Sequence, residues 1–260
     1  MADAIRVENV SKTFTRRYQR TIKQITVAKV RRQRTIETFQ AVDDVSFTVE
    51  QGESIGLMGL NGSGKSTMLK MINGVMRPDD GSILVRGRIA GLIATGAGFH
   101  TQLSGRDNII LNAAILGMSE KETRRKFDAI VDFAGPSVEK QLDQQVGHYS
   151  SGQSARLGFA IAIHVDSDIF LADEVLAVGD RPFKQKCLAK MQEIRDGGRT
   201  LFYVSHAAGS VRKMCDRVIV LEKGRLAFDG GVDAGIKFVK YDEGTGTEEE
   251  LADEDVGGDI

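Results

Sequence analysis

A glycine-rich segment at residues 59–66 (GLNGSGKS) has the spacing of a phosphate-binding loop, G-x-x-x-x-G-K-S/T. Glycines let backbone N–H groups curl around a phosphate with no Cβ in the way. Lys65 would reach the β- and γ-phosphates of a nucleotide, the Ser66 hydroxyl would bind Mg²⁺, and Thr67 would reach the α-phosphate. A chance glycine-rich turn is the alternative, but this segment lies between an expected buried strand (54–58) and an expected helix (66–75). We therefore predict a nucleotide-binding loop made of Gly59, Leu60, Asn61, Gly62, Ser63, Gly64, Lys65, Ser66 and Thr67.

Two adjacent acids, Asp173 and Glu174, follow an apolar stretch that is typical of a buried strand (168–172). Consecutive strand residues point to opposite sides, so the two carboxylates can do different work. Asp173 would bind Mg²⁺ directly or through water, and Glu174 would act as the general base that activates a water molecule. Taken alone, two solvated acids at a strand end would be the simpler interpretation.

A histidine, His206, follows a second expected strand at 200–204. The carboxyl ends of parallel strands share one edge of a sheet, which would place His206 on the same rim as Lys65 and Glu174. There it could hydrogen-bond the γ-phosphate and hold the geometry of the attacking water. A lone histidine is more often structural, and a functional role for His206 is supported only by its expected neighbours.

A short segment at 149–153 (YSSGQ) ends 20 residues before Asp173 and opens an expected helix. A serine and a glycine at a helix start offer a hydroxyl and free N–H groups to an anion. The segment resembles the signature motif of ABC ATPases, usually LSGGQ, although Ser151 replaces the first glycine and Tyr149 replaces the leucine. With the glycine loop, the acid pair and the histidine in the expected order, the chain resembles this family over about residues 5–230.

The resemblance implies a head-to-tail homodimer that holds two ATP molecules between its subunits. Ser150, Gly152 and Gln153 of one copy would contact the γ-phosphate of the ATP bound by Lys65 of the other copy. Asp180 would be the acid that links the two sites across the dimer. ATP would thus hold the dimer together, hydrolysis would release it, and this cycle would drive a separate transmembrane permease.

Two positions of the family pattern stay open. The glutamine of the family's Q-loop is not at its expected place, which aligns with Ala94-Thr95, and Gln102 is a weak substitute. The resemblance also implies that an aromatic residue near the N-terminus stacks on adenine. Phe14 fits this role best by position, and Tyr18 is the second choice because a basic insertion blurs the alignment.

Three stretches resemble the ATPases that export O-antigen, teichoic acid, capsule or galactan: residues 96–108, residues 149–152, and residues 173–180 with Phe183 and Lys186-Cys187 downstream. This resemblance implies export of a lipid-linked polysaccharide, with the chain bound to two permease copies at the cytoplasmic face of the cell membrane. The alternatives are another class of ABC transporter or a soluble ABC ATPase. A soluble ABC ATPase usually carries two cassettes or a long coiled-coil insertion, and a kinase or GTPase would not need the YSSGQ segment.

The net charge of -1 conceals two oppositely charged segments. Residues 15–39 hold eight Lys or Arg and one Glu, a net +7, whereas residues 242–260 hold nine acids and no Lys or Arg. We expect the acidic tail to be disordered. The basic insertion would lie near the permease and the anionic inner leaflet, where each basic residue contributes about 1 kcal/mol. A solvated insertion, or an interface with the permease alone, is the alternative, and no nucleic acid is expected as a partner.

Strands and helices alternate after residue 168, which predicts an α/β cassette of the P-loop NTPase type with a largely parallel sheet. The expected elements there are helix 181–195, strand 200–204, helix 208–214, strand 217–222 and strand 225–228. Earlier strands are expected at 5–10, 45–50 and 82–86, and the cassette would include an N-terminal antiparallel β part. The ATP-binding domain would span 1–241, with an inserted helical subdomain at about 100–165.

Two further features concern the compartment. No stretch approaches the 18 uncharged apolar residues of a membrane span, and the N-terminus lacks the layout of a signal peptide, which predicts a cytosolic location. Cys187 and Cys215 show no metal-binding spacing, and we expect both to be packed thiols in a reducing compartment.

Overall fold

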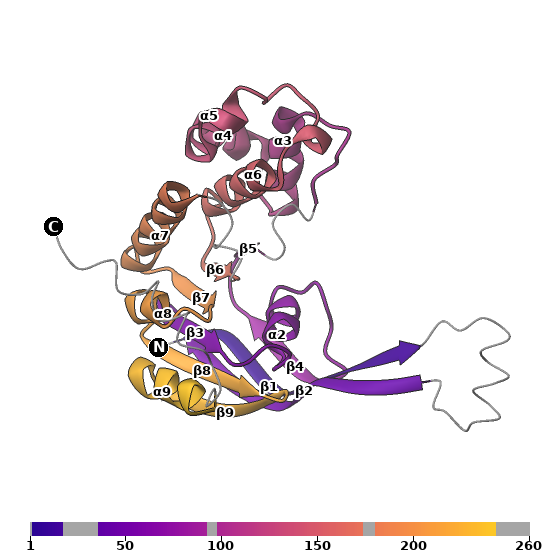
Figure 1. Ribbon diagram of the computed structural model, residues 1–260, viewed down its shortest axis with the longest axis vertical. Helices are drawn as coiled ribbons and strands as arrows, with labels where there is room; N and C mark the ends of the chain where they lie inside the picture. Colours follow the sequence, from indigo (N-terminus) through magenta and orange to yellow (C-terminus); the bar gives the residue numbers. More distant parts are fainter. Residues whose placement is uncertain (1, 18–35, 93–97, 174–179, 243–260) are drawn as a thin grey trace, which may run out of the picture.

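Two β-sheets and a group of helices make up the described part of the chain in this computed structural model, which covers residues 2–17, 36–92, 98–173 and 180–242 (Figure 1). The smaller sheet is antiparallel and has the order β2-β1-β4. Its strands are β1 (Asp3–Arg17), β2 (Ile36–Glu50) and β4 (Asp80–Val85). This sheet is the N-terminal antiparallel part that the sequence predicts.

The larger sheet has six strands in the order β5-β6-β7-β3-β8-β9, and all its neighbouring strands are parallel except β8 and β9. The strands are β3 (Ser54–Met58), β5 (Ile89–Leu92), β6 (Ile169–Ala172), β7 (Thr200–Val204), β8 (Arg217–Glu222) and β9 (Arg225–Gly231). Every residue of β3, β6 and β7 is buried, which is why these strands are continuous apolar runs in the sequence. The predicted α/β cassette with a largely parallel sheet is confirmed.

The larger sheet separates two cores, one on each of its faces, and helices cover both faces. Helix α2 (Lys65–Ile72) packs between the two sheets, in a core where the rings of Phe47 and Phe202 stack at 6.2 Å. The second core lies under α7 (Arg181–Asp196), α8 (Ala208–Met214) and α9 (Val232–Asp242) and continues into the helical group. Burial raises the pKa of the Cys187 and Cys215 thiols to about 12, so both are packed thiols of low reactivity, as predicted.

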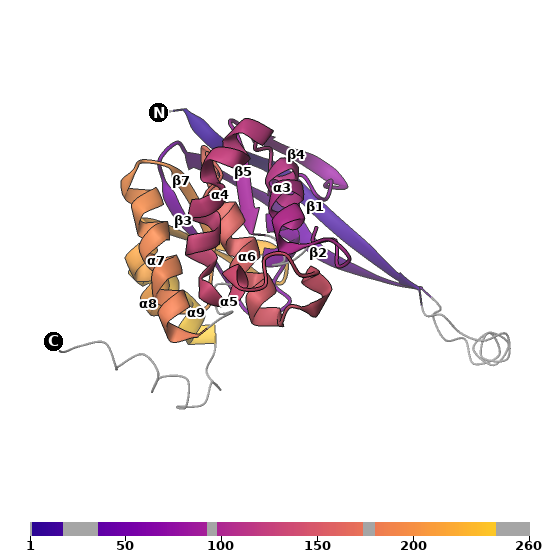
Figure 2. The same cartoon turned by 90° about the horizontal axis from the view of Figure 1, so that it is seen from above.

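The helical group lies at one end of the molecule, apart from the antiparallel sheet (Figure 1), and it overlies the sheets when seen from that end (Figure 2). It comprises α3 (Gly105–Ile115), α4 (Glu120–Ala134), α5 (Pro136–Glu139), a short 3₁₀ helix (Val146–His148) and α6 (Ser151–Ile163). One face of α4 is apolar: Ile130, Val131 and Ala134 are buried and Phe127 is half-buried. Ser119 caps the start of α4 by accepting a hydrogen bond from the N–H of Glu122, and the chain leaves the helix at Gly135.

The main departure from the sequence prediction is the length of β1 and β2. The expected strands 5–10 and 45–50 extend to Asp3–Arg17 and Ile36–Glu50, and their pairing continues as far as Arg17 opposite Ile36. The two ends of the basic insertion are therefore strands of a hairpin arm that projects from the body (Figure 1). Residues 18–35 and 243–260, which carry most of the two predicted charge segments, lie outside the described residues.

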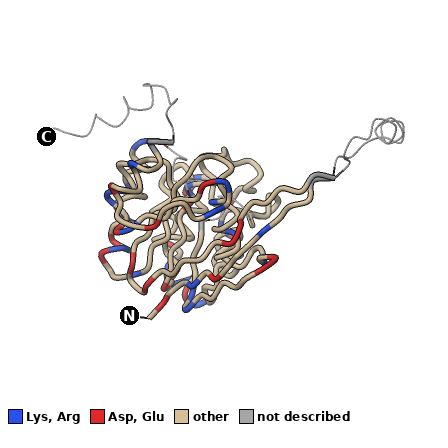
Figure 3. The backbone as a smooth tube through the Cα atoms, turned by 90° about the horizontal axis from the view of Figure 1, so that it is seen from below, with Lys and Arg blue, Asp and Glu red and all other residues tan. Residues whose placement is uncertain are grey.

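Two elements were not predicted from the sequence. Strand β5 has only four residues, too few for a clear periodic signal, and it forms the edge of the large sheet. Helix α9 follows β9 directly and is held by the stacking of Phe238 on Phe228 at 5.7 Å. Over the described body, acidic and basic residues are interspersed (Figure 3). Within the same ranges, every helix is too short or too polar to cross a bilayer.

A buried asparagine, Asn108, fixes the loop that leads into the helical group. Its side-chain oxygen accepts from the N–H of His100 at 2.8 Å, and its amide nitrogen donates to the carbonyls of His100, Leu103 and Ser104 at 2.9–3.1 Å. The side chain is fully buried, so each of these bonds replaces lost contact with water. The loop before α3 is thus shaped by one residue of α3 itself.

We predict that Asn108→Asp destabilises the fold by on the order of 3 kcal/mol. The substitution replaces a buried amide, which donates to three carbonyl oxygens, with a carboxylate oxygen that can only accept. Asn108→Ala should cost less than Asn108→Asp, since it leaves no repulsive charge. Urea unfolding followed by circular dichroism measures both changes. Asn112→Asp is the graded comparison, because Asn112 donates to two carbonyls rather than three; equal stability of Asn108→Asp and the wild type would contradict the prediction.

Candidate nucleotide site

A pocket of about 180 Å³ opens at the edge of the large sheet where β3, β6 and β7 end. These strands are neighbours in the order β6-β7-β3 and run parallel, so the residues that follow them meet at one rim. The pocket is lined by Phe39, Ala41, Asn61, Gly62, Ser63, Gly64, Lys65, Ser66, Thr67, Asp173, Val204 and His206. The structure therefore brings together most of the glycine loop, the first acid and the histidine.

Two glycines of the loop are required by close backbone contacts. Gly59 has φ +135°, and a Cβ there would lie 2.1 Å from the carbonyl oxygen of Leu221. Gly64 has φ +106°, and a Cβ there would lie 2.4 Å from the carbonyl oxygen of Ala41. Neither position can hold a side chain without moving backbone, so the loop keeps its tight curl. Gly64 is also the residue from which α2 starts, and no side chain caps that helix start.

The lysine of the loop is held over the loop itself. Lys65 is 7% exposed, and its ammonium nitrogen donates to the carbonyls of Gly59 at 2.6 Å and Leu60 at 3.0 Å. Its positive charge therefore lies beside the start of α2, where the helix dipole also favours an anion. The arrangement suits a polyphosphate, because charge and backbone N–H groups converge on one point.

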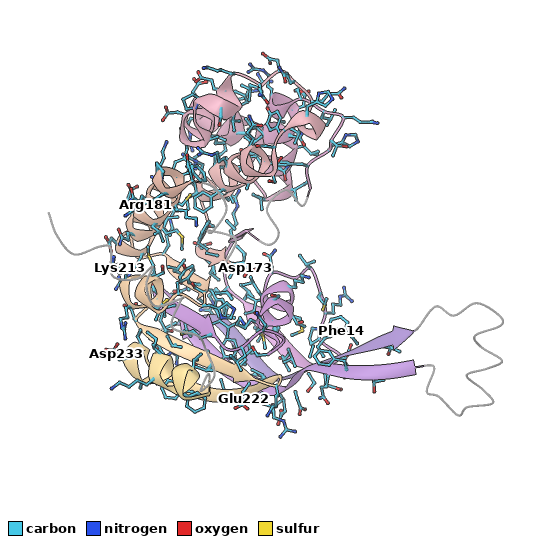
Figure 4. All side chains as sticks on the ribbon, viewed as in Figure 1. Phe14, Asp173, Arg181, Lys213, Glu222 and Asp233 are labelled. Atoms are coloured by element: carbon cyan, nitrogen blue, oxygen red, sulfur yellow. The ribbon has the colours of Figure 1, made fainter. Side chains whose placement is uncertain are left out.

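The acid and the histidine line the same pocket as the loop. Asp173 is half-buried and directly follows β6, where Figure 4 labels it. His206 is also half-buried, and the Ser205 hydroxyl beside it accepts from the N–H of Ala207 at 3.1 Å, which turns the chain after β7. The predicted general base, Glu174, lies outside the described residues, and its role stays a prediction.

Oxygen donors suited to Mg²⁺ are present on both walls. The Ser66 hydroxyl and the Asp173 carboxylate line the same pocket. In the described ranges, no cluster of three or more His, Cys, Asp or Glu side chains is placed to hold a metal by itself. Mg²⁺ usually binds through one or two protein oxygens together with substrate phosphates and water, so these two donors fit it.

The aromatic residue that lines the pocket is Phe39, which the sequence analysis did not select. Phe39 on β2 stands directly opposite Phe14 on β1, so both rings lie on the same face of the arm. Phe39 is 55% exposed and Phe14 is 37% exposed. The ammonium of Lys12 lies 6.0 Å from the centroid of the Phe14 ring and is ion-paired with Asp79 at 2.6 Å.

The predicted stacking role of Phe14 stays a prediction, and Phe39 joins it as a candidate. Figure 4 shows Phe14 on the strand pair that leads away from the body. The second choice of the sequence analysis, Tyr18, lies outside the described residues. The partnership of Phe14 with Phe39 depends on the register of the arm, which no local sequence signal gives.

We predict that Phe39→Ala weakens the binding of ADP and ATP by roughly 5- to 100-fold, since loss of one base–aromatic stack costs about 1–3 kcal/mol. Phe14→Ala should weaken binding less, because Phe14 does not line the pocket. Calorimetric titration with ADP measures both, and Phe39→Tyr is the conservative control that should bind like the wild type. A large effect of Phe14→Ala together with a negligible effect of Phe39→Ala would assign the base to Phe14 instead.

The YSSGQ segment forms the start of α6, where Ser150 and Gln153 hydrogen-bond to each other. Ser150 caps the helix: its hydroxyl accepts from the N–H of Gln153 at 3.1 Å, and the Gln153 side-chain oxygen accepts from the N–H of Ser150 at 2.9 Å. This reciprocal pair is a capping box. The Gln153 amide nitrogen donates to the carbonyl of Ser137 at 2.9 Å. A direct contact of Gln153 with a phosphate stays a prediction, and in this structure its amide shapes the helix start.

Tyr149, which replaces the usual leucine, has a specific packing role. Its hydroxyl donates to the carbonyl of Gln141 at 2.8 Å, and a Cβ on Gly105 would lie 2.2 Å from that hydroxyl oxygen. Burial raises the pKa of Tyr149, because the phenolate would lose hydration. The ring therefore fixes the approach to α6 against the first residue of α3.

Several predicted site residues lie away from the pocket. Among the described residues, Phe14, Ser150, Gly152, Gln153 and Asp180 do not line it, and neither do Gly59 and Leu60 at the start of the loop. Asp180 caps α7 and is ion-paired with Arg156 at 2.6 Å. Of the Q-loop candidates, Gln102 is exposed, and Ala94-Thr95 lie outside the described residues.

We predict that Gln153→Ala lowers the free energy of unfolding by about 1 kcal/mol, because the first turn of α6 loses half of its capping box. Gln153→Glu should recover part of that loss, since a carboxylate still accepts from the N–H of Ser150 and is favoured at a helix start. Thermal unfolding of the two variants gives the order. If alanine and glutamate at this position are equally destabilising, the capping box does not hold the helix start.

Comparison with known proteins gives one matching family model, described as ABC transporter, over residues 42–177. The chain is 45% identical over 195 residues to the ABC transporter protein AbcA of Aeromonas salmonicida, covering 75% of this chain and 63% of that protein. It is 41% identical over 202 residues to the O-antigen export system ATP-binding protein RfbB of Klebsiella pneumoniae, covering 78% and 81%. It is 40% identical over 196 residues to the teichoic acids export ATP-binding protein TagH of Bacillus anthracis, covering 75% and 35%.

The fold is similar to that of solved ATP-binding cassettes. A dimeric cassette described as a post-hydrolysis state with ADP and Pi superposes with a TM-score of 0.69, covering 88% of this chain and 98% of that one. The sequences are 22% identical, so this similarity shows the fold alone. The chain spans most of the length of the Klebsiella relative but only 63% and 35% of the Aeromonas and Bacillus relatives.

Proposed function

This chain belongs to the ABC transporter family, and we propose that it hydrolyses ATP to drive export of a lipid-linked polysaccharide through a separate membrane protein. The observation that carries the proposal is the single pocket that joins the glycine loop, Asp173 and His206 at the edge of the parallel sheet. The polysaccharide class is supported by relatives whose names refer to O-antigen and teichoic acid export. The chain would act at the cytoplasmic face of the membrane, where it would meet two permease copies.

The residues of the pocket suit phosphoryl transfer to water, a reaction in which positioning and electrostatics supply most of the catalysis. Lys65 and the start of α2 would stabilise negative charge on the β- and γ-phosphates. Ser66 and Asp173 would hold Mg²⁺, which neutralises charge on the phosphates when it is bound. Glu174 would accept the proton of the attacking water, and His206 would hold the γ-phosphate in line with it.

A second copy of the chain would complete each site. In this structure Ser150 and Gly152 lie at a helix start that does not line the pocket of the same chain. The Ser150 hydroxyl already accepts a bond from Gln153, so it can still donate its hydrogen to an anion. We propose that this helix start meets the γ-phosphate of ATP bound by the other copy. A solved cassette of similar fold is described as a dimer with ADP and Pi, which is consistent with such an arrangement.

The hairpin arm connects the basic insertion to the body of the protein. Paired strands run through Thr15–Arg17 on one side and Ile36–Thr38 on the other. The arm would carry the basic residues of 18–35 toward the permease and the anionic leaflet. Contact with the permease alone is the alternative role of the same residues.

We predict that Glu174→Gln keeps ATP binding, lowers turnover at least 100-fold and accumulates an ATP-bound dimer, because the water loses its general base. Light scattering coupled to gel filtration, with ATP and then with ADP, should show the dimer with ATP only. The matched variant Glu174→Gln with Ser150→Arg should remain monomeric, since a bulky cation would occupy the helix start. Normal hydrolysis by Glu174→Gln would disprove the assignment of Glu174, and a dimer of the double variant would disprove that of Ser150.

A further inference from the structure

The signature helix α6 and the start of α7 are joined by one half-buried arginine. Arg156 lies six residues after Ser150 on α6, and its guanidinium nitrogen is 2.6 Å from a carboxylate oxygen of Asp180. The guanidinium carbon also lies 4.5 Å from the centroid of the Phe183 ring. The same Asp180 oxygen accepts from the N–H of Phe183 at 3.2 Å. Arg156 therefore contacts both the cap and the first turn of α7.

Other contacts make this a joint between α7 and two helices of the helical group, α4 and α6. The Phe183 ring packs edge-on against Phe133 of α4 and Phe159 of α6, with ring centroids 5.9 and 6.1 Å apart. The ammonium of Lys186 donates to the carbonyls of Asp132 and Phe133, at the last turn of α4, at 3.2 and 3.3 Å. Figure 1 shows α7 lying between the helical group and the sheet. One stretch of sequence, residues 180–187, thus supplies the cap, the ring and the cation.

Each chain would contribute two parts to the proposed ATP sites, and this joint connects the elements that carry them. One part is the chain's own pocket, which β6 supplies with Asp173. The other part is the helix start at Ser150, which would meet the nucleotide of the other copy. Seven residues after Asp173, the chain reaches Asp180, and there Arg156 ties it to the helix that begins at Ser150.

We infer that Arg156 is a positioning residue for ATP hydrolysis: its ion pair with Asp180 keeps the signature helix α6 in a fixed relation to α7, which packs against β7, a strand that ends at the nucleotide pocket. The inference rests on the proposed function. Arg156 touches neither the pocket nor the helix start that would meet phosphate, so it acts through Asp180 and Phe183. Its planar guanidinium can pair with the carboxylate and stack on the ring at once, which a lysine cannot do.

The exposure of the two partners separates a positioning role from a merely stabilising one. Asp180 is 59% exposed and Arg156 is 20% exposed, so solvent screens the pair and its loss should change stability little. Hydrolysis is more sensitive, because a displacement of about 1 Å caused by a distant mutation can lower a rate by about 100-fold. We therefore expect a loss of turnover that is much larger than the loss of stability.

The chain offers a matched control on the same helix. Arg195, in the last turn of α7, is ion-paired with Asp216 at 2.9 Å, and the two side chains are 33% and 51% exposed. This pair fixes the other end of α7, away from the nucleotide pocket. Arg195→Gln should therefore shift the melting temperature about as much as Arg156→Gln while leaving ATP turnover unchanged.

The test is a double-mutant cycle on ATP hydrolysis by the full chain. Arg156→Gln and Asp180→Asn should each lower kcat by about 10- to 100-fold, with the KM for ATP within about twofold of the wild type. Asparagine still accepts from the N–H of Phe183, so the cap of α7 survives in Asp180→Asn. If the two residues act as a unit, the double variant should be no slower than the slower single variant. Arg156→Lys should recover part of kcat, because it keeps the charge but loses the stack.

Two results would overturn the inference and leave the proposed function standing. In the first, the wild type hydrolyses ATP and the kcat of Arg156→Gln is within twofold of the wild-type value. In the second, the reductions in kcat caused by the two single variants multiply in the double variant. Should Arg156→Gln fail to fold, Asp180→Asn and Arg156→Lys decide the question by the same comparison. A wild-type chain that does not hydrolyse ATP would instead refute the proposed function, and the inference with it.

Discussion

The site depends on one steric constraint: the glycine loop curls so tightly that backbone from other strands occupies the space of two missing side chains. At Gly59 that backbone belongs to β8, and at Gly64 it belongs to β2 of the antiparallel sheet. The loop is therefore clamped by both sheets, and the start of α2 has a fixed direction. Everything else in the site is placed relative to it, because β6 and β7 run parallel to β3 and end at the same rim. Anion binding follows from backbone geometry before any charged side chain is considered.

The parts of the site that were predictable from the sequence are those in which one local segment contains both the chemistry and its context. The loop around Lys65 lies between its own strand and helix, and Asp173 ends a fully apolar strand. Phe39 was missed because its place beside Phe14 depends on pairing between strands separated by the basic insertion. The contact of Arg156 with Asp180 was missed for the same reason, since it joins residues 24 positions apart on different helices.

The departures of the signature segment from the family pattern have physical explanations. Tyr149 reaches the carbonyl of Gln141 with a hydroxyl that leucine lacks, and the same hydroxyl oxygen occupies the space left by Gly105. Ser151 is an exposed residue of the first turn of α6, so its side chain needs no internal space. Gln153 closes the capping box and also holds the carbonyl of Ser137. The helix start is thus shaped within one chain, which would lower the ordering cost of the proposed contact with a phosphate bound by another copy.

The joint at residues 180–187 overlaps one of the three stretches that resemble the polysaccharide exporters, although Asp180 does not line the pocket. In a dimer that encloses two nucleotides, each chain has to contact one nucleotide through its glycine loop and the other through its signature helix at the same time. Whether both fit together depends on the relation between the sheet and the helical group, and α7 contacts both, beside the direct contact of α6 with β5. Asp180, Phe183 and Lys186 bind three different features of the helical group: a cation, an aromatic cluster and a helix end. Three kinds of contact at one joint restrict the rotation of α7 against the helical group in more directions than one strong contact could. The residue types of this stretch therefore serve to fix the position of α7 rather than to take part in the reaction.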